Sequence, residues 1–106
     1  MLVPVGPCLL EGVLLDLGEY PGLVVGPGIV RGELFSMPEG DLALGILDEY
    51  ECYDRGDEEH SLYLRRQVPL VDPDETAWVY LYNGAAHGCP VVASGDWLDR
   101  NGRAPP

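Results

Sequence analysis

Short apolar stretches, separated by glycine and proline, follow one another through the first third of the chain. Their length and residue types are typical of β-strands. They predict three strands, at residues 9–17, 23–25 and 29–37. Val3-Pro4-Val5-Gly6-Pro7 is predicted to be an edge strand or an extended lead-in rather than a central strand, because neither proline can donate to a sheet ladder. Gly26-Pro27-Gly28 fits a type II turn and predicts a hairpin between the last two strands.

The spacing of apolar residues changes to that of a helix after Pro38-Glu39-Gly40. Four side chains then follow the i, i+3, i+4, i+7 pattern of one buried helix face: Ala43, Ile46, Leu47 and Tyr50. The pattern predicts a helix over residues 42–50, and Asp41 is a good N-cap for it. This is the one convincing helix that the sequence predicts.

A second hairpin is predicted in the second half of the chain, with strands at residues 62–71 and 76–82. In the latter strand Trp78, Tyr80 and Tyr82 share one face. Residues 91–93 are predicted to form a short strand, and Ser94-Gly95-Asp96-Trp97 to close the fold with an aromatic plug. Residues from about 100 to 106 are predicted to be a frayed tail. The sequence therefore predicts a strand-rich α+β domain with one main helix.

The length and charge narrow the class of protein. The 106 residues, 46% of them hydrophobic, suit one domain over residues 1–106. The net charge of −12 argues against nucleic acid or an anionic membrane as a partner. The apolar runs are far shorter than the ~20 residues of a membrane span, and no signal peptide pattern precedes them. Cys8, Cys52 and Cys89 lack a C-x-x-C pair, which favours free thiols in a reducing cytoplasm over a disulfide.

Two segments contain residues that bind ligands in other proteins, but their spacing favours a plainer interpretation. Gly26, Gly28 and Gly32 form G-x-G-x-x-x-G rather than a phosphate-binding G-x-G-x-x-G, and no helix pattern follows. Residues 54–60 hold acids and His60, yet they lack the D-x-D-x-D-G spacing of a calcium loop. We therefore expect a turn at the glycines and a solvated loop at residues 54–60, with no metal and no cofactor. A cation-binding protein that uses the acidic loop is the last alternative.

The end of the predicted helix carries three carboxylates, Asp48, Glu49 and Glu51. Unpaired carbonyl groups and the like charge of Asp48 should raise the pKa of Glu51 if its side chain is partly buried. A carboxyl group of that kind can take and return a proton near neutral pH. The competing interpretation is a solvated acidic helix end.

Six segments resemble, in order, motifs of gamma-glutamylcyclotransferase-like proteins. Gly12 to Val24 is similar to their G-x-L-x-D-L-G-x-Y-P-x-L-V segment, and Leu47 to Glu51 is similar to their L-D-x-x-E helix end. The other four are the V-x-G-E-L-Y strand, the S-x-Y-x-R strand, the last strand and the closing motif: Val30 to Phe35, Ser61 to Arg65, Ala77 to Asn83 and Ser94 to Trp97. Each motif alone is weak, but together they are strong and span about 90 residues of the chain.

The resemblance implies a small mixed, mostly antiparallel β-barrel with one main helix packed against it and a cavity on one side. Enzymes of this family cyclise a gamma-glutamyl group, releasing 5-oxoproline and a free amine without a cofactor. Their acid/base glutamate falls on Glu51. Tyr63 and Tyr82 fall where the family places pocket tyrosines, although aromatic core is an equally good interpretation of each. Gly18 and Tyr20, in the D-L-G-x-Y-P motif, are further candidates for substrate binding.

The chain also departs from the family pattern. It contains no Tyr-Gly dipeptide, whereas the family opens with a strand and a Y-G-[ST] loop that holds the substrate. We therefore expect a domain truncated at its N-terminus relative to the family, with an exposed edge strand that a second copy could cover as a homodimer. The alternative to an active cyclotransferase is an inactive small-molecule-binding or structural module of the same fold.

Overall fold

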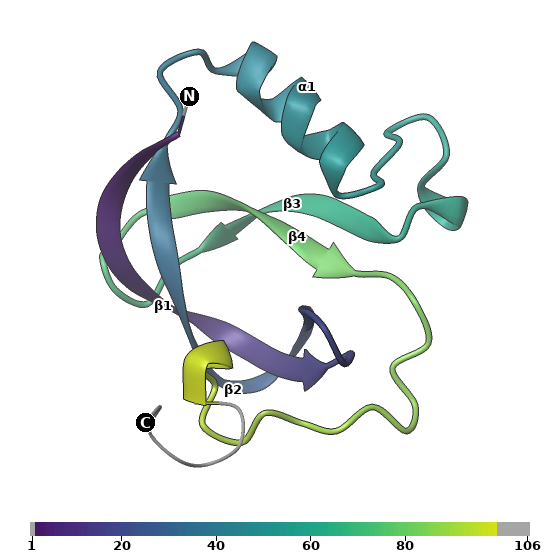
Figure 1. Cartoon of the computed structure of the whole chain (residues 1–106). Helices are drawn as coiled ribbons and strands as arrows, with labels where there is room; N and C mark the ends of the chain where they lie inside the picture. The colour runs from purple at the N-terminus through teal and green to yellow at the C-terminus, as the bar shows by residue number, and fades with distance from the viewer. Residues whose placement is uncertain (1, 100–106) are drawn as a thin grey trace.

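The computed structural model describes residues 2–99, which form two antiparallel β-hairpins and one α-helix (Figure 1). β1 (Val3–Asp16) pairs with β2 (Pro21–Ser36), and β3 (Tyr63–Pro69) pairs with β4 (Thr76–Tyr82). The helix α1 (Asp41–Tyr50) and the single-turn 3₁₀-helix η1 (Glu58–His60) lie between the two hairpins in the chain. A second single-turn 3₁₀-helix, η2 (Trp97–Asp99), follows the second hairpin. The predicted α+β class is confirmed. Among the described residues, no helix has the length and apolar character needed to cross a membrane.

The first hairpin is longer than the sequence predicts. β2 runs without a break through Gly26-Pro27-Gly28, so the predicted type II turn is wrong. Glu11 pairs with Ile29 and Val13 with Val24, which leaves the segment between these two partners as a bulge opposite Gly12. Gly28 supplies the positive φ of 135° that the bulge needs. The true turn of the hairpin is at residues 17–20, where the Leu17 amide donates to the Tyr20 carbonyl at 3.1 Å.

The proline-containing start of the chain belongs to the same sheet. Residues 3–7, predicted as an edge strand or a lead-in, form the first part of β1 and pair with the end of β2, so the edge-strand alternative is confirmed. Register shifts between Pro4 and Gly6 accommodate the missing amide donors. β1 is therefore a strand of 14 residues that spans the domain.

α1 begins and ends within one residue of its predicted bounds, but its buried face differs from the prediction. Ala43 is buried as predicted, but Ile46 and Tyr50 are 64% and 82% exposed, and Leu44 is buried instead. The helix is rotated so that Leu47, Asp48 and Glu51 also turn inward. The N-cap is Gly40, with φ at +57°, rather than Asp41. The rotation brings acidic side chains of the last turn towards the second hairpin.

The predicted second hairpin is confirmed, and its register places Tyr63 opposite Tyr82 and Pro69 opposite Thr76. The chain after β4 curves back beneath β1 and β2 (Figure 1). There the Val92 amide donates to the Leu14 carbonyl and the Arg31 amide to the Gly95 carbonyl, each at 2.8 Å. The predicted strand at residues 91–93 is thus reduced to the isolated bridge between Val91 and Leu15.

The buried core lies where this returning segment meets the first hairpin. Its members come from β1, β2, the end of the second hairpin and the returning segment: Cys8, Leu10, Leu14, Val30, Leu70 and Val92. Ala77, Val79 and Trp97 pack against them. The three cysteines are all described, and all are free thiols.

We expect Gly95→Ala to destabilise the fold by about 2–4 kcal/mol and Gly88→Ala by about 1–2 kcal/mol. Both glycines have a positive φ, +71° and +84°, so the conformational cost is shared. Only at Gly95 would a Cβ collide with backbone, the Ile29 carbonyl oxygen. Urea unfolding of the two variants measures the difference, and equal losses would contradict this assignment of the steric term.

Candidate active site

A cavity of about 940 Å³ lies between the two hairpins, beside α1. Most of its wall is apolar or aromatic, as at Leu44, Phe35 and Trp78. Of the five predicted site residues, Glu51, Tyr63 and Tyr20 line this cavity together. Gly18 and Tyr82 are not among its lining residues. The fold therefore gathers the candidate acid/base and two candidate binding residues around one space.

Glu51 is placed by the end of α1. Its backbone amide donates to the Leu47 carbonyl at 2.8 Å, and the next residue, Cys52, has a positive φ of 54° that turns the chain away from the helix axis. The Glu51 side chain is half-buried. Burial raises the pKa of this carboxyl group above its ordinary value. The shift has the predicted direction, and its cause is the partial burial that the prediction required, rather than the unpaired carbonyls or the charge of Asp48.

Asp48 is instead engaged by two groups from the second hairpin. Its Oδ1 accepts a hydrogen bond from the Tyr80 hydroxyl at 2.5 Å and lies 3.3 Å from Arg65 Nε. The two charged side chains are only 19% and 11% exposed. The guanidinium of Arg65 also stacks over the ring of Trp78, 4.7 Å from its centroid. Asp48, whose charge is balanced by that of Arg65, therefore ties the last turn of α1 to β3 and β4.

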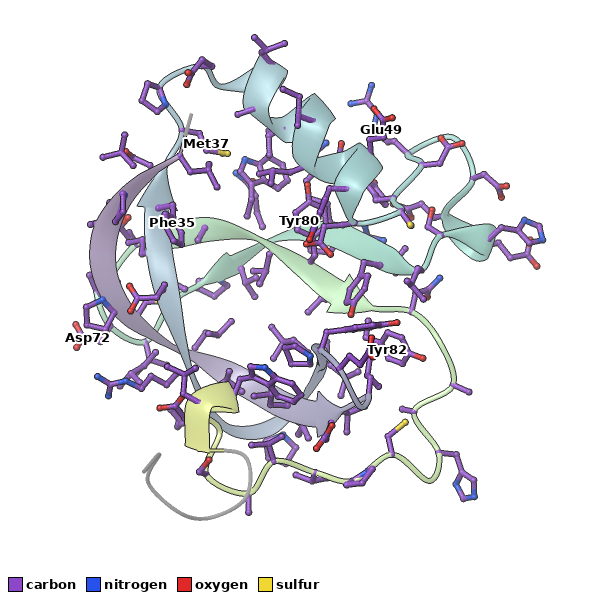
Figure 2. All side chains as sticks on the ribbon, in the orientation of Figure 1. Phe35, Met37, Glu49, Asp72, Tyr80 and Tyr82 are labelled. Carbon is purple, nitrogen blue, oxygen red and sulfur yellow. The ribbon has the colours of Figure 1, made fainter. Side chains whose placement is uncertain are left out.

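Tyr80 lies beneath α1, while Glu49 points away on the outer side of the helix (Figure 2). Burial and the hydrogen bond to Asp48 raise the pKa of Tyr80, and the charge of Glu51 contributes in the same direction. Tyr80 lines the same cavity as Glu51. Of the three acids at the helix end, Asp48 is thus structural, Glu49 is solvated and Glu51 faces the cavity.

Tyr63 connects the cavity to the turn of the first hairpin. Its hydroxyl donates to the Pro21 carbonyl at 2.9 Å, and its ring packs edge-on against Tyr82 with centroids 5.7 Å apart. Burial and the nearby charge of Glu51 raise the pKa of Tyr63 to about 12. Tyr63 therefore stays protonated at neutral pH and acts as a donor. Tyr82 supports the Tyr63 ring from outside the cavity, near the start of β2 at Gly22.

The other two predicted residues sit in the turn before β2. Tyr20 lines the cavity and is half exposed. The Gly18 amide donates to Asp16 Oδ1 at 2.8 Å, and its φ of +107° shapes the turn. Gly18 thus positions the segment that carries Tyr20.

The acidic loop after α1 is held by hydrogen bonds within the loop and by Arg66 of β3. Arg66 donates to both carboxylate oxygens of Glu58 at 2.9 Å, and the Tyr53 hydroxyl donates to Glu58 Oε2 at 2.7 Å. The hydrogen bonds from Arg66 and Tyr53 lower the pKa of Glu58. His60 Nδ1 lies 2.9 Å from Asp57 Oδ1. Within residues 2–99, no group of three or more histidine, cysteine, aspartate or glutamate residues is arranged to hold a metal ion.

Sequence reasoning missed Arg65, Trp78 and Tyr80 as parts of the site. A signal was present, because Arg65 is the last residue of the S-x-Y-x-R motif and Tyr80 lies opposite it in the hairpin register. The partner of this pair, Asp48, comes from a helix, and a contact between helix and sheet leaves no periodic trace in the sequence.

Comparison with known proteins decides the family. The family described as "Gamma-glutamyl cyclotransferase, AIG2-like" matches residues 2–99. The chain belongs to this family. It is 39% identical over 88 residues to the gamma-glutamylcyclotransferase family protein YtfP of Escherichia coli K12, an alignment that covers 83% of this chain and 69% of that protein. The family assignment made from the sequence motifs is confirmed.

Two solved structures share the fold. The solution structure of YtfP from Escherichia coli matches with a TM-score of 0.67 at 34% identity, over 91% of this chain and 77% of the other. The crystal structure of PH0828 from Pyrococcus horikoshii matches with a TM-score of 0.68 at 17% identity, over 94% of this chain and 75% of the other. The second match concerns the fold alone.

The raised pKa of Glu51 has a consequence for stability. The folded state favours the protonated form of Glu51, and this preference contributes to the stability of the fold. The contribution is fully present below the unfolded pKa of about 4.3 and is lost as the pH rises through the folded pKa. We expect Glu51→Gln to melt at a higher temperature than the wild type at pH 8, with a smaller gap at pH 4. Melting temperatures of both proteins at the two pH values test this, and a less stable variant at pH 8 would contradict it.

Proposed function

We propose that this chain is a gamma-glutamyl cyclotransferase that converts a gamma-glutamyl amide or peptide into 5-oxoproline and a free amine. The observation that carries the proposal is the half-buried carboxyl group of Glu51, with a raised pKa, in the wall of a large cavity. Membership of the family supports the choice of substrate class. A carboxyl group in this setting is suited to proton transfer near neutral pH.

In the proposed reaction the α-amine of the substrate attacks its own γ-carbonyl carbon. One C–N bond forms to close the five-membered ring, and the C–N bond to the leaving amine breaks. Because nucleophile and electrophile belong to one molecule, the protein needs chiefly to fold the substrate into the reactive conformation. The Glu51 carboxylate accepts the proton that the attacking amine loses and delivers it to the leaving nitrogen. The carboxylate is regenerated, and the proton balance requires no cofactor.

The tyrosines around Glu51 have proposed roles in binding. Tyr63, which remains protonated, and Tyr20 would contact the gamma-glutamyl group, since both line the cavity with Glu51. Tyr82 would act through Tyr63 by fixing its ring, and Gly18 by shaping the turn that carries Tyr20. The apolar wall formed by Leu44, Leu47 and Trp78 is available to the amine side of the substrate.

The free thiols support a cytoplasmic location for this activity. Cys52 is exposed and unpaired, a state that a reducing compartment maintains. Cell fractionation of the source organism tests the location, and recovery of the protein outside the cytoplasm would overturn it.

The test of the proposed function is release of 5-oxoproline from a panel of gamma-glutamyl amides that differ in the amine: alkyl, aryl, amino-acid and peptide. We expect at least one class to be turned over by the purified protein in metal-free buffer. A folded protein that binds members of the panel without releasing 5-oxoproline would instead support the inactive binding module.

A further inference from the structure

Tyr80 is a polar residue of the cavity wall to which the proposed reaction gives no role. It comes from β4, lies beneath α1 and lines the cavity together with Glu51 (Figure 2). Burial and the hydrogen bond to Asp48 raise the pKa of Tyr80, and the charge of Glu51 acts in the same direction. The Tyr80 hydroxyl therefore lies close enough to the carboxyl group of Glu51 for the two groups to influence each other.

The hydrogen bond with Asp48 fixes how the Tyr80 oxygen can bind a further group. A tyrosine hydroxyl has one proton to donate, and its oxygen can also accept. Tyr80 donates this proton to Asp48 Oδ1 at 2.5 Å. Arg65 Nε lies 3.3 Å from the same oxygen and balances the charge of Asp48, so that Asp48 is the acceptor of the pair. The remaining hydrogen-bonding capacity of Tyr80 is that of an acceptor.

The surroundings of Tyr80 strengthen this acceptor. A hydroxyl that donates to a carboxylate is polarised, which makes its oxygen a better acceptor for the next donor. The neighbouring hydroxyl of Tyr63 is committed in the same way, because it donates its proton to the Pro21 carbonyl at 2.9 Å. Tyr63 and Tyr80 thus offer acceptors in the same cavity as the carboxyl group of Glu51. Such a set suits a ligand group that carries several N–H donors.

We propose that Tyr80 binds the α-amino group of the substrate and holds the attacking nitrogen between its oxygen and the carboxyl group of Glu51. This assignment rests on the proposed cyclotransferase function and names the residue that receives the nucleophile. One N–H of the amine donates to Tyr80, while the nitrogen lone pair attacks the γ-carbonyl carbon. The proton that the nitrogen loses goes to Glu51, and Tyr80 neither gains nor loses a proton. Asp48 acts on the substrate only through Tyr80.

The test compares two sulfones in which sulfur replaces the γ-carbonyl carbon, so that the amine has no carbonyl to attack. S-benzyl-L-homocysteine sulfone has the α-amino group, and 4-(benzylsulfonyl)butanoic acid lacks it. Calorimetry gives the Kd of each for wild type, Tyr80→Phe and the control Tyr53→Phe. The Tyr53 hydroxyl also donates to a carboxylate, that of Glu58 at 2.7 Å, but Tyr53 is not among the lining residues of the cavity.

We expect the wild type to bind the amino sulfone at least ~100-fold more tightly than the deamino sulfone, because Tyr80 and Glu51 each contribute a charge-assisted hydrogen bond. Tyr80→Phe should reduce this ratio by at least ~10-fold, and Tyr53→Phe should keep it. If Tyr80 only fixed the position of α1, its loss would weaken both sulfones alike and leave the ratio unchanged.

A measurement on the wild type complements the variants. The ¹³Cζ resonance of Tyr80 should shift when the amino sulfone binds and should not shift with the deamino sulfone. An unchanged ratio in Tyr80→Phe, an equal loss in Tyr53→Phe, the same ¹³Cζ shift with both sulfones, or a wild type that binds neither sulfone would overturn the proposal. Because both ligands are unreactive, absence of 5-oxoproline release in the assay above leaves this result unaffected.

Discussion

Replacing Glu51 by glutamine is expected to lower the rate of 5-oxoproline release by at least ~10²-fold with the best gamma-glutamyl amide. Glutamine keeps the shape of the side chain and its place at the end of α1 but cannot accept the proton of the attacking amine. The substrate should still bind, because the cavity wall is unchanged. The measurement is kcat and KM for wild type and variant, with the loss expected in kcat.

Glu49→Gln is the matched control for this experiment. It removes one negative charge from the same helix end, yet Glu49 is exposed and points away from the cavity (Figure 2). Its activity should stay close to that of the wild type. Equal kcat values for Glu51→Gln and wild type would refute the assigned role. A matching loss in both variants would mean that net charge, and not proton transfer, controls the rate.

Local patterns predicted the elements that they determine. The i, i+3, i+4, i+7 spacing located α1 to within one residue, and the alternation at β4 predicted the second hairpin with its aromatic face. The same spacing placed Ala43 correctly on the buried face but Ile46 and Tyr50 wrongly, because the latter two are more apolar than Asp48 and Glu51. The face of α1 that turns inward is decided by its contacts with the second hairpin, where Arg65 and Tyr80 bind Asp48. Such long-range pairing has no periodic signal.

The glycine and proline positions show the same limit of local sequence patterns, which do not include contacts with other strands. Gly26-Pro27-Gly28 has the sequence of a turn, but β1 has enough residues to continue past it, so the segment becomes a bulge inside β2. Turn propensity describes four residues, whereas the bulge depends on the partner strand β1, on the other side of the turn at residues 17–20. The family motifs supplied what local patterns could not. They singled out Glu51 among three neighbouring acids, and it is the one of the three that faces the cavity.

Removing the charge of Arg65 is the second change with a large expected effect. In Arg65→Met, Asp48 would remain as a largely buried carboxylate whose one side-chain partner within residues 2–99 is the Tyr80 hydroxyl. We expect a loss of about 2–4 kcal/mol in the free energy of unfolding. Activity should fall as well, because the last turn of α1, which carries Glu51, is no longer tied to β3 and β4. Urea unfolding and the 5-oxoproline assay measure the two effects.

Arg66→Met, at the next residue of β3, is the control. Arg66 pairs with Glu58, and the two side chains are 43% and 39% exposed, so solvent screens this pair and its loss should cost much less. The double variant Asp48→Asn with Arg65→Met should be more stable than the sum of the two single losses predicts, since no uncompensated charge remains. If Arg65→Met and Arg66→Met were equally stable, the Asp48–Arg65 pair would not be what anchors the end of α1. If Arg65→Met were destabilised but fully active, the pair would anchor the helix without positioning Glu51.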